Sequence, residues 1–133
     1  MDKIALIYFD GGSRGNPGAA AGAAIIEFGG RLHTFSRYLG EVTSPVAEYG
    51  GLILALEKAL ELGIQQAKIH GDSELIIKHL NGVYKVRKPH LRSLYDEART
   101  HLSKIIKYEL LWIPREQNTL ADAAVNECID KAL

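Results

Sequence analysis

The segment "YFDGGSRGNPG", Tyr8 to Gly18, joins an apolar run to a stretch rich in glycine. Residues 3–10 are apolar on both alternating sets of positions, which is typical of a central strand covered on both faces. This strand is expected to end at Asp10, and the glycines that follow are expected to form a loop. A carboxylate at the end of a buried strand suggests a functional site, although Asp10 alone fits a turn residue equally well.

The bulk composition indicates a globular domain of ordinary type. The chain has 133 residues, 47% of them hydrophobic and 24% charged, and its net charge is zero. A polyanionic partner would therefore need a local basic patch. The lone Cys128 rules out an internal disulfide and fits a reducing compartment. No apolar run reaches the ~18 residues of a membrane span, and Asp2 directly after Met1 argues against a signal peptide. We expect one cytoplasmic, monomeric domain over residues 1–133.

The remaining sequence alternates strand and helix patterns. Strands are expected over residues 19–28 and 31–39, joined by a Gly29-Gly30 turn, and again over 67–71 and 108–113. A helix is expected with Ser44 as its cap, Pro45 at its first position and Gly63 at its end. Further helices are expected over 73–81 and 91–105, and from a cap at Asn118 or Thr119 to the end. The opening hairpins favour an antiparallel part of a sheet, and the later alternation favours a parallel part. The sequence therefore predicts an α/β fold with a mixed sheet and helices on its faces.

Three further acids occupy places comparable to that of Asp10. Asp72 follows the fourth strand, so parallel strands would bring it to the same sheet edge as Asp10. Glu48 lies on the apolar face of its helix, one turn from the start, where a buried acid needs a partner. Asp122 lies in the first turn of the last helix. These four acids are expected to converge on one site.

Clustered carboxylates need cations. The sequence places no Lys or Arg to neutralise them, and their pKa values rise unless a cation joins them. Grouped oxygen ligands suit Mg²⁺ or Mn²⁺, and two such ions ~4 Å apart serve in-line phosphoryl displacement. Gly11 and Gly12 would then let a phosphodiester approach the backbone.

Each acid also has a structural explanation. Asp72 fits a cap for the helix at Ser73, and Thr119 with Asp122 forms a T-x-x-D capping pattern. Glu48 is the hardest to explain structurally. The joint arrangement favours a site, and it depends on the inferred topology.

Four motifs in this order resemble the type 1 ribonuclease H family over almost the whole chain. They are Asp10–Gly18 (DGGSRGNPG), Ala47-Glu48-Tyr49, Gly71-Asp72-Ser73, and Trp112–Asn118 (WIPREQN) with Ala121-Asp122 and Asn126. The resemblance implies a ribonuclease H-like fold. Its five-stranded mixed sheet has three antiparallel strands first, the fourth and fifth parallel to the first, and helices on both faces.

The resemblance also implies an activity, namely endonucleolytic cleavage of the RNA strand of RNA/DNA hybrids with two divalent cations. The products would carry 5′-phosphate and 3′-hydroxyl ends. Asp10 would bridge both ions. Asp122 would join it on the ion that activates water, whereas Glu48 and Asp72 would hold the ion beside the leaving 3′-oxygen.

Substrate contacts are implied for a further set of residues: Gly11, Gly12, Ser13, Asn16, Thr43, Ser44, Ser73 and Glu74. Relatives often have Thr-Asn-Asn where this chain has Thr43-Ser44-Pro45, and often have Gln at the position of Glu74, so the preference for hybrid is open. Arg115 is the nearest candidate for helping phosphate binding or product release. A basic loop (Lys85, Arg87, Lys88, His90, Arg92) fits either phosphate contact or a solvated charge run. Trp112 is expected to be a packing residue.

Three alternatives stay open. An enzyme of this kind could also cut duplex RNA, and a module without activity could bind hybrid. The four acids argue against the second, because losing one acid is the simplest way to abolish the site. A nucleotide-binding domain is disfavoured because the glycine-rich segment lacks both G-x-x-x-x-G-K-[ST] and G-x-G-x-x-G.

Overall fold

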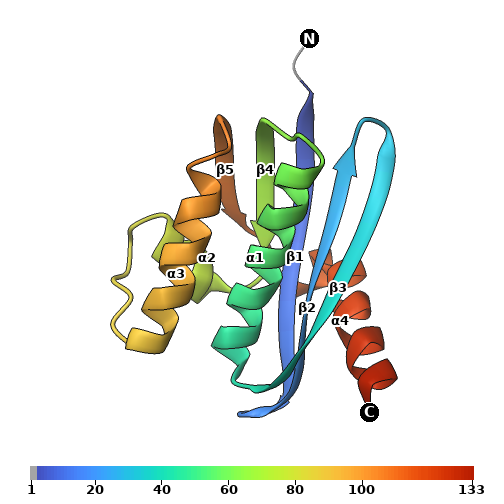
Figure 1. Ribbon diagram of the computed structural model, residues 1–133, viewed down its shortest axis with the longest axis vertical. Coiled ribbons are helices and arrows are strands. Elements are labelled where there is room, and N and C mark those ends of the chain that lie inside the picture. Colours follow the sequence, from blue (N-terminus) through green and yellow to red (C-terminus); the bar gives the residue numbers. More distant parts are fainter. Residues whose placement is uncertain (1–2) are drawn as a thin grey trace.

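The computed structural model describes residues 3–133 and confirms the expected order of elements. The five strands form one sheet in the order β3-β2-β1-β4-β5 (Figure 1). The elements are β1 (Ile4–Gly15), β2 (Gly18–Phe28), β3 (Arg31–Val42), α1 (Ser44–Glu61), β4 (Gln66–Gly71), α2 (Glu74–Leu80), α3 (Pro89–Leu102), β5 (Lys107–Trp112), a 3₁₀ helix (Arg115–Gln117) and α4 (Thr119–Ala132). Met1 and Asp2, on which the expectation of no signal peptide rests, lie outside the described residues.

The sheet is mixed, as expected. β1 pairs antiparallel with β2, and β2 with β3, whereas β4 lies parallel to β1 and β5 parallel to β4. The turn between β2 and β3 is made by Gly29 and Gly30 with φ values of 60° and 77°, which confirms the glycine turn. Within residues 3–133, no helix is both long and apolar enough to cross a membrane.

The expectation that the first strand ends at Asp10 is wrong. β1 continues to Gly15, and Gly11 and Gly12 pair with Gly22 and Ala21 of β2. What ends near Asp10 is the parallel pairing with β4, whose last pair is Phe9 with Gly71. At Asp10 the chain therefore stops pairing with β4 and continues to pair with β2. The glycines that follow belong to a strand instead of a loop.

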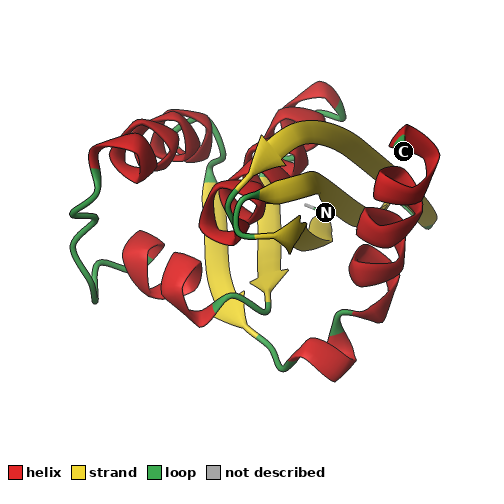
Figure 2. Cartoon of the chain, turned by 90° about the horizontal axis from the view of Figure 1, so that it is seen from below, coloured by secondary structure: helices red, strands yellow, loops and turns green. Residues whose placement is uncertain are grey.

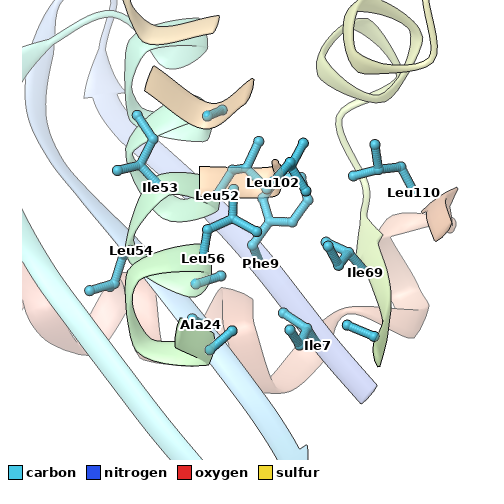
Figure 3. Packing of buried hydrophobic residues seen from close by; sticks show 14 of the residues in the cluster. Ile7, Phe9, Ala24, Leu52, Ile53, Leu54, Leu56, Ile69, Leu102 and Leu110 are labelled. Atoms are coloured by element: carbon cyan, nitrogen blue, oxygen red, sulfur yellow. The ribbon is translucent and has the colours of Figure 1, made fainter. Parts of the chain in front are cut away.

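Helices α1 and α4 cover opposite faces of the sheet (Figures 1 and 2). The larger core lies under α1 and α3, where Ile7 and Phe9 of β1 pack with Leu52 and Leu56 of α1 and with Ile69 of β4 (Figure 3). The smaller core lies under α4 and consists of Ala21, Ala23, Ala124, Val125 and Ile129. Because both faces of the central strands are covered, their apolar pattern is continuous, as the sequence indicated.

The start of α1 depends on a residue distant in sequence. The helix includes Ser44, so the expectation that Ser44 caps it is wrong by one residue. Thr43 is the N-cap without a side-chain bond, and Pro45 is the second helical residue. The free amide of Ser44 instead donates to Asn16 Oδ1 at 3.1 Å. The turn between β1 and β2 thereby satisfies one of the unpaired amides at the start of α1.

Glycines bring the backbone of α1 into direct contact with the sheet. A Cβ atom on Gly11 would lie 2.0 Å from the carbonyl oxygen of Ala47, and one on Gly51 would lie 2.0 Å from that of Asp10. A Cβ on Gly22, the partner of Gly11 in β2, would lie 2.6 Å from Gly51 N. These sites require glycine because helix and strands touch main chain to main chain.

We expect Gly51→Ala to destabilise the protein by at least about 2 kcal/mol, measured by urea denaturation, because the new methyl group overlaps the Asp10 carbonyl. This should occur although alanine favours helix by roughly 1 kcal/mol. Gly50→Ala is the matched control, because the three atoms nearest to its Cβ all belong to the side chain of Leu39, the first at 2.7 Å, and a side chain can move. Equal stabilities of the two variants would contradict the backbone contact.

Candidate active site

The four predicted acids come from four elements and line one cavity. The parallel register ends with the pair Phe9 and Gly71, so Asp10, inside β1, and Asp72, directly after β4, are the next residues along the two chains. Together with Glu48 of α1 and Asp122 of α4 they line a cavity of about 320 Å³. The convergence inferred from topology is therefore present in the structure.

Asp10 is the most buried of these acids, with 9% of its surface exposed. Burial and the neighbouring charge of Asp72 raise its pKa from 3.8 to about 7, and the charges of Asp122 and Glu48 add to this. A hydrogen bond from Gly11 N to Asp10 Oδ1, 2.8 Å long, opposes the rise. An extra positive charge in the cavity would therefore stabilise the ionised site.

Glu48 follows Ala47, whose carbonyl contacts β1 at Gly11. Burial is the main cause that raises the pKa of Glu48, a hydrogen bond with Ser73 lowers it, and the charge of Asp72 raises it again. The contact between α1 and β1 thus places this acid beside the strand that carries Asp10.

Asp72 is held by two donors. Its carboxylate Oδ2 accepts from Asn118 Nδ2 at 3.0 Å, and its backbone carbonyl accepts from Trp112 Nε1 at 3.1 Å. It does not cap α2, because Ser73 is the N-cap and its hydroxyl accepts from Ile76 N. The capping explanation for Asp72 is therefore wrong.

Asp122 is held in the first turn of α4. Its backbone amide donates to Asn118 O at 3.1 Å, and no side-chain hydrogen bond caps the helix, so the T-x-x-D capping pattern is not formed. Arg115 Nη2 lies 3.6 Å from Asp122 Oδ1. The expectation that no basic residue neutralises the acids is wrong at this one position, although the Arg115 side chain is 80% exposed.

The donor set of the cavity fits hard divalent cations. All four acids offer oxygen, two of them have raised pKa values, and Arg115 at the rim is the one basic side chain that pairs with them among the described residues. Mg²⁺ and Mn²⁺ prefer such ligands. Glu57, Glu97 and His101 also group their ligand atoms within 4.8 Å, but Glu57 there accepts from Arg37, and none of the three lines the cavity.

The expected substrate contacts divide into two groups. Gly11, Gly12, Ser13, Ser44 and Arg115 line the cavity, whereas Asn16, Thr43, Ser73 and Glu74 do not. In the first group, the absence of side chains on Gly11 and Gly12 leaves room for α1 and α4, since a Cβ on Gly12 would lie 3.1 Å from Val125. Packing therefore accounts for these two glycines, and their contact with a phosphodiester stays a prediction.

Several polar side chains of this set are already engaged inside the protein. The Ser13 hydroxyl lies within hydrogen-bonding distance of three carbonyl oxygens, including that of Val42 at 2.7 Å. Asn16 Oδ1 accepts a hydrogen bond from Ser44 N. Glu74 Oε1 forms an ion pair with Lys78 Nζ at 2.5 Å. Lys78 therefore offsets the negative charge of Glu74.

Two residues near the cavity have roles that differ from those expected. Asn118 was expected only as a helix cap, yet its side chain contacts Asp72 and the Phe9 carbonyl. Trp112 was expected to pack, yet it is 51% exposed and holds the backbone of Asp72. Both lie in the WIPREQN motif, so the motif located them without indicating these contacts.

Known proteins resemble the chain along most of its length. A family model described as "Reverse transcriptase-like" matches residues 8–128. A Mycobacterium tuberculosis protein described as bifunctional is 38% identical over 130 residues, and its solved N-terminal ribonuclease H domain superimposes with a TM-score of 0.94, covering 98% of this chain and 96% of that one. A ribonuclease HI from Halobacterium salinarum is 39% identical over 127 residues.

A third relative is known with nucleic acid. LC11 ribonuclease H1, solved in complex with RNA/DNA hybrid, is 40% identical with a TM-score of 0.89 and coverage of 96% of this chain and 98% of that one. The chain spans 36% of the length of the mycobacterial protein and 64% of the halobacterial one, and the alignments cover 96% and 94% of this chain. The fold, the converging acids and the family match together establish that the chain belongs to the type 1 ribonuclease H family.

Proposed function

We propose that this protein is an endoribonuclease that hydrolyses the RNA strand of RNA/DNA hybrids with Mg²⁺ or Mn²⁺. The observation that carries the proposal is the convergence of Asp10, Glu48, Asp72 and Asp122 on one cavity, where burial and mutual repulsion raise the Asp10 pKa to about 7. Such a cluster costs stability unless cations join it. The hybrid in complex with a 40% identical relative supports the choice of substrate.

Asp10 and Asp122 would hold one cation, and Asp10, Glu48 and Asp72 the other. Two bound cations would supply Lewis-acid polarisation of the phosphate and make the attacking water more acidic. In the hydrolysis, the water oxygen bonds to phosphorus, the bond to the 3′-oxygen breaks, and that oxygen takes a proton. This gives 5′-phosphate and 3′-hydroxyl ends.

The remaining residues would orient the substrate. Gly11, Gly12, Ser13 and Ser44 line the cavity and would contact the strand at the scissile phosphate, with Asn16, Thr43, Ser73 and Glu74 at its margins. Arg115 is exposed beside Asp122 and would contact phosphate or assist product release. Of the basic residues expected in one loop, His90 and Arg92 lie in α3 instead. Arg92 is in an ion pair with Asp96, whereas Lys85, Arg87 and Lys88 are in none among residues 3–133 and would be free to track phosphates. A single-domain monomer and a cytoplasmic location stay predictions.

A cleavage assay tests this function. Labelled RNA/DNA hybrid, duplex RNA and duplex DNA are incubated with Mg²⁺, Mn²⁺ or chelator and separated on a gel. We expect hybrid to be cut only with metal, and Asp10→Asn to lower kcat by about a thousand-fold or more, because several kcal/mol of charge stabilisation are lost.

Glu61→Gln is the control, because Glu61 is an exposed acid at the end of α1 paired with Lys58, and it should leave cleavage unchanged. Cutting of hybrid in chelator would contradict the metal role. Cutting of duplex RNA alone would move the substrate to that alternative, and hybrid that is bound but never cut would favour a module without activity.

The stability of the metal-free protein should fall as pH rises from about 4 to about 7. The folded pKa of Asp10, about 7, lies above its ordinary value of 3.8, so in this window the folded protein keeps a proton that the unfolded chain releases. Rising pH therefore favours unfolding. In chelator, the Tm of the wild type should drop more steeply between pH 5 and 8 than that of Asp10→Asn.

Saturating Mg²⁺ should restore the wild-type Tm at pH 8 and change the Asp10→Asn variant less, because the cations bind the ionised acids. Parallel profiles of Tm against pH for the two proteins in chelator would contradict the raised pKa of Asp10.

A further inference from the structure

Asn118 is a buried amide at the junction of the elements that carry three of the acids. Only 2% of its surface is exposed, and it lies between the 3₁₀ helix and α4. Its backbone carbonyl accepts from Asp122 N at 3.1 Å. Its side chain therefore begins at the turn of α4 that holds Asp122, and it extends toward the sheet edge.

The side-chain NH₂ group of Asn118 has two acceptors. Nδ2 donates to Phe9 O at 2.9 Å and to Asp72 Oδ2 at 3.0 Å. Phe9 immediately precedes Asp10 in β1. One amide thus connects the backbone next to Asp10, the carboxylate of Asp72 and the helix turn of Asp122.

The contacts also fix which way the amide points. If the amide were turned over, its oxygen would face a carbonyl and a carboxylate, and both are acceptors. In the observed orientation, Oδ1 is buried without a hydrogen-bond partner among the described residues. A buried acceptor without a partner is unfavourable for folding, so the two donated bonds are kept at a cost to stability.

A second observation points the same way. Asn118 occupies the N-cap position of α4, where an asparagine side chain usually accepts from the helix amides, yet it makes no such bond. The side chain contacts Asp72 instead of stabilising its own helix. Trp112 holds the backbone of the same residue, so Asp72 is fixed at both its main chain and its carboxylate.

We propose that Asn118 is a positioning residue that fixes the carboxylate of Asp72 beside Asp10, so that the pair is oriented for cations before they bind. A carboxylate held by a buried donor loses little further rotational freedom on binding, and such supporting hydrogen bonds typically contribute 10–100-fold in metal affinity. The inference rests on the proposed function in taking Asp72 as a cation ligand.

The test measures Mn²⁺ binding by calorimetry in the absence of nucleic acid, alongside thermal unfolding and cleavage kinetics. Asn118→Ala removes the donor, and Asn118→Leu removes it while filling the space. Both should weaken Mn²⁺ binding about 10-fold or more, lower kcat, and leave KM for hybrid unchanged. Asn81→Ala is the control, because the Asn81 amide donates to Leu110 O at 3.1 Å, outside the cavity.

A double-mutant cycle shows whether the effect passes through Asp72. In an Asp72→Asn background, Asn118→Leu should change Mn²⁺ affinity and kcat less than about 2-fold. The proposal is overturned by folded Asn118 variants with wild-type Mn²⁺ affinity, by equal effects in both backgrounds, or by failure of both variants to fold. A wild type that binds Mn²⁺ but cuts no hybrid would refute the proposed function alone.

Discussion

The main-chain contact between α1 and the sheet determines the rest of the arrangement. Gly11, Gly22 and Gly51 carry no side chains at the points where the two backbones meet, and a single methyl group at Gly11 or Gly51 would lie 2.0 Å from a carbonyl oxygen. This contact sets the distance of Glu48 from the strand of Asp10. A larger side chain at these positions would push α1 away from the sheet, and Glu48 would move with it. The glycines of the opening motif thus serve the site through packing.

The cavity combines this rigid frame with unfavourable electrostatics. Asp10 and Asp72 lie where the parallel pairing of β1 with β4 ends, and helices on opposite faces of the sheet each add one more acid. The fold tolerates the repulsion because Asp10 can keep a proton, Arg115 lies near Asp122, and Ser73 and Asn118 donate to the other two acids. A site that is strained without cations and relaxed with them is suited to binding divalent ions.

Much of this could be predicted from the sequence, because periodicity and turn residues have local causes. The order of strands and helices, the Gly29-Gly30 turn and the convergence of the acids follow from such signals. The continuation of β1 past Asp10 could not be predicted, because a run of glycines suggests a loop unless its packing against α1 is known. The hydrogen bond from the backbone amide of Ser44 to Asn16 joins residues 28 positions apart. The one from the side-chain amide of Asn118 to Asp72 joins residues 46 positions apart. No local pattern encodes such contacts.

We infer that the four acids form one cation site in the folded protein. The most direct measurement is anomalous diffraction from crystals of the protein soaked in Mn²⁺. We expect Mn²⁺ peaks inside the cavity, with Asp10 as a ligand and Glu48, Asp72 and Asp122 around it. Clear density for the four side chains without a Mn²⁺ peak between them, or a peak only at Glu57, Glu97 and His101, would contradict it.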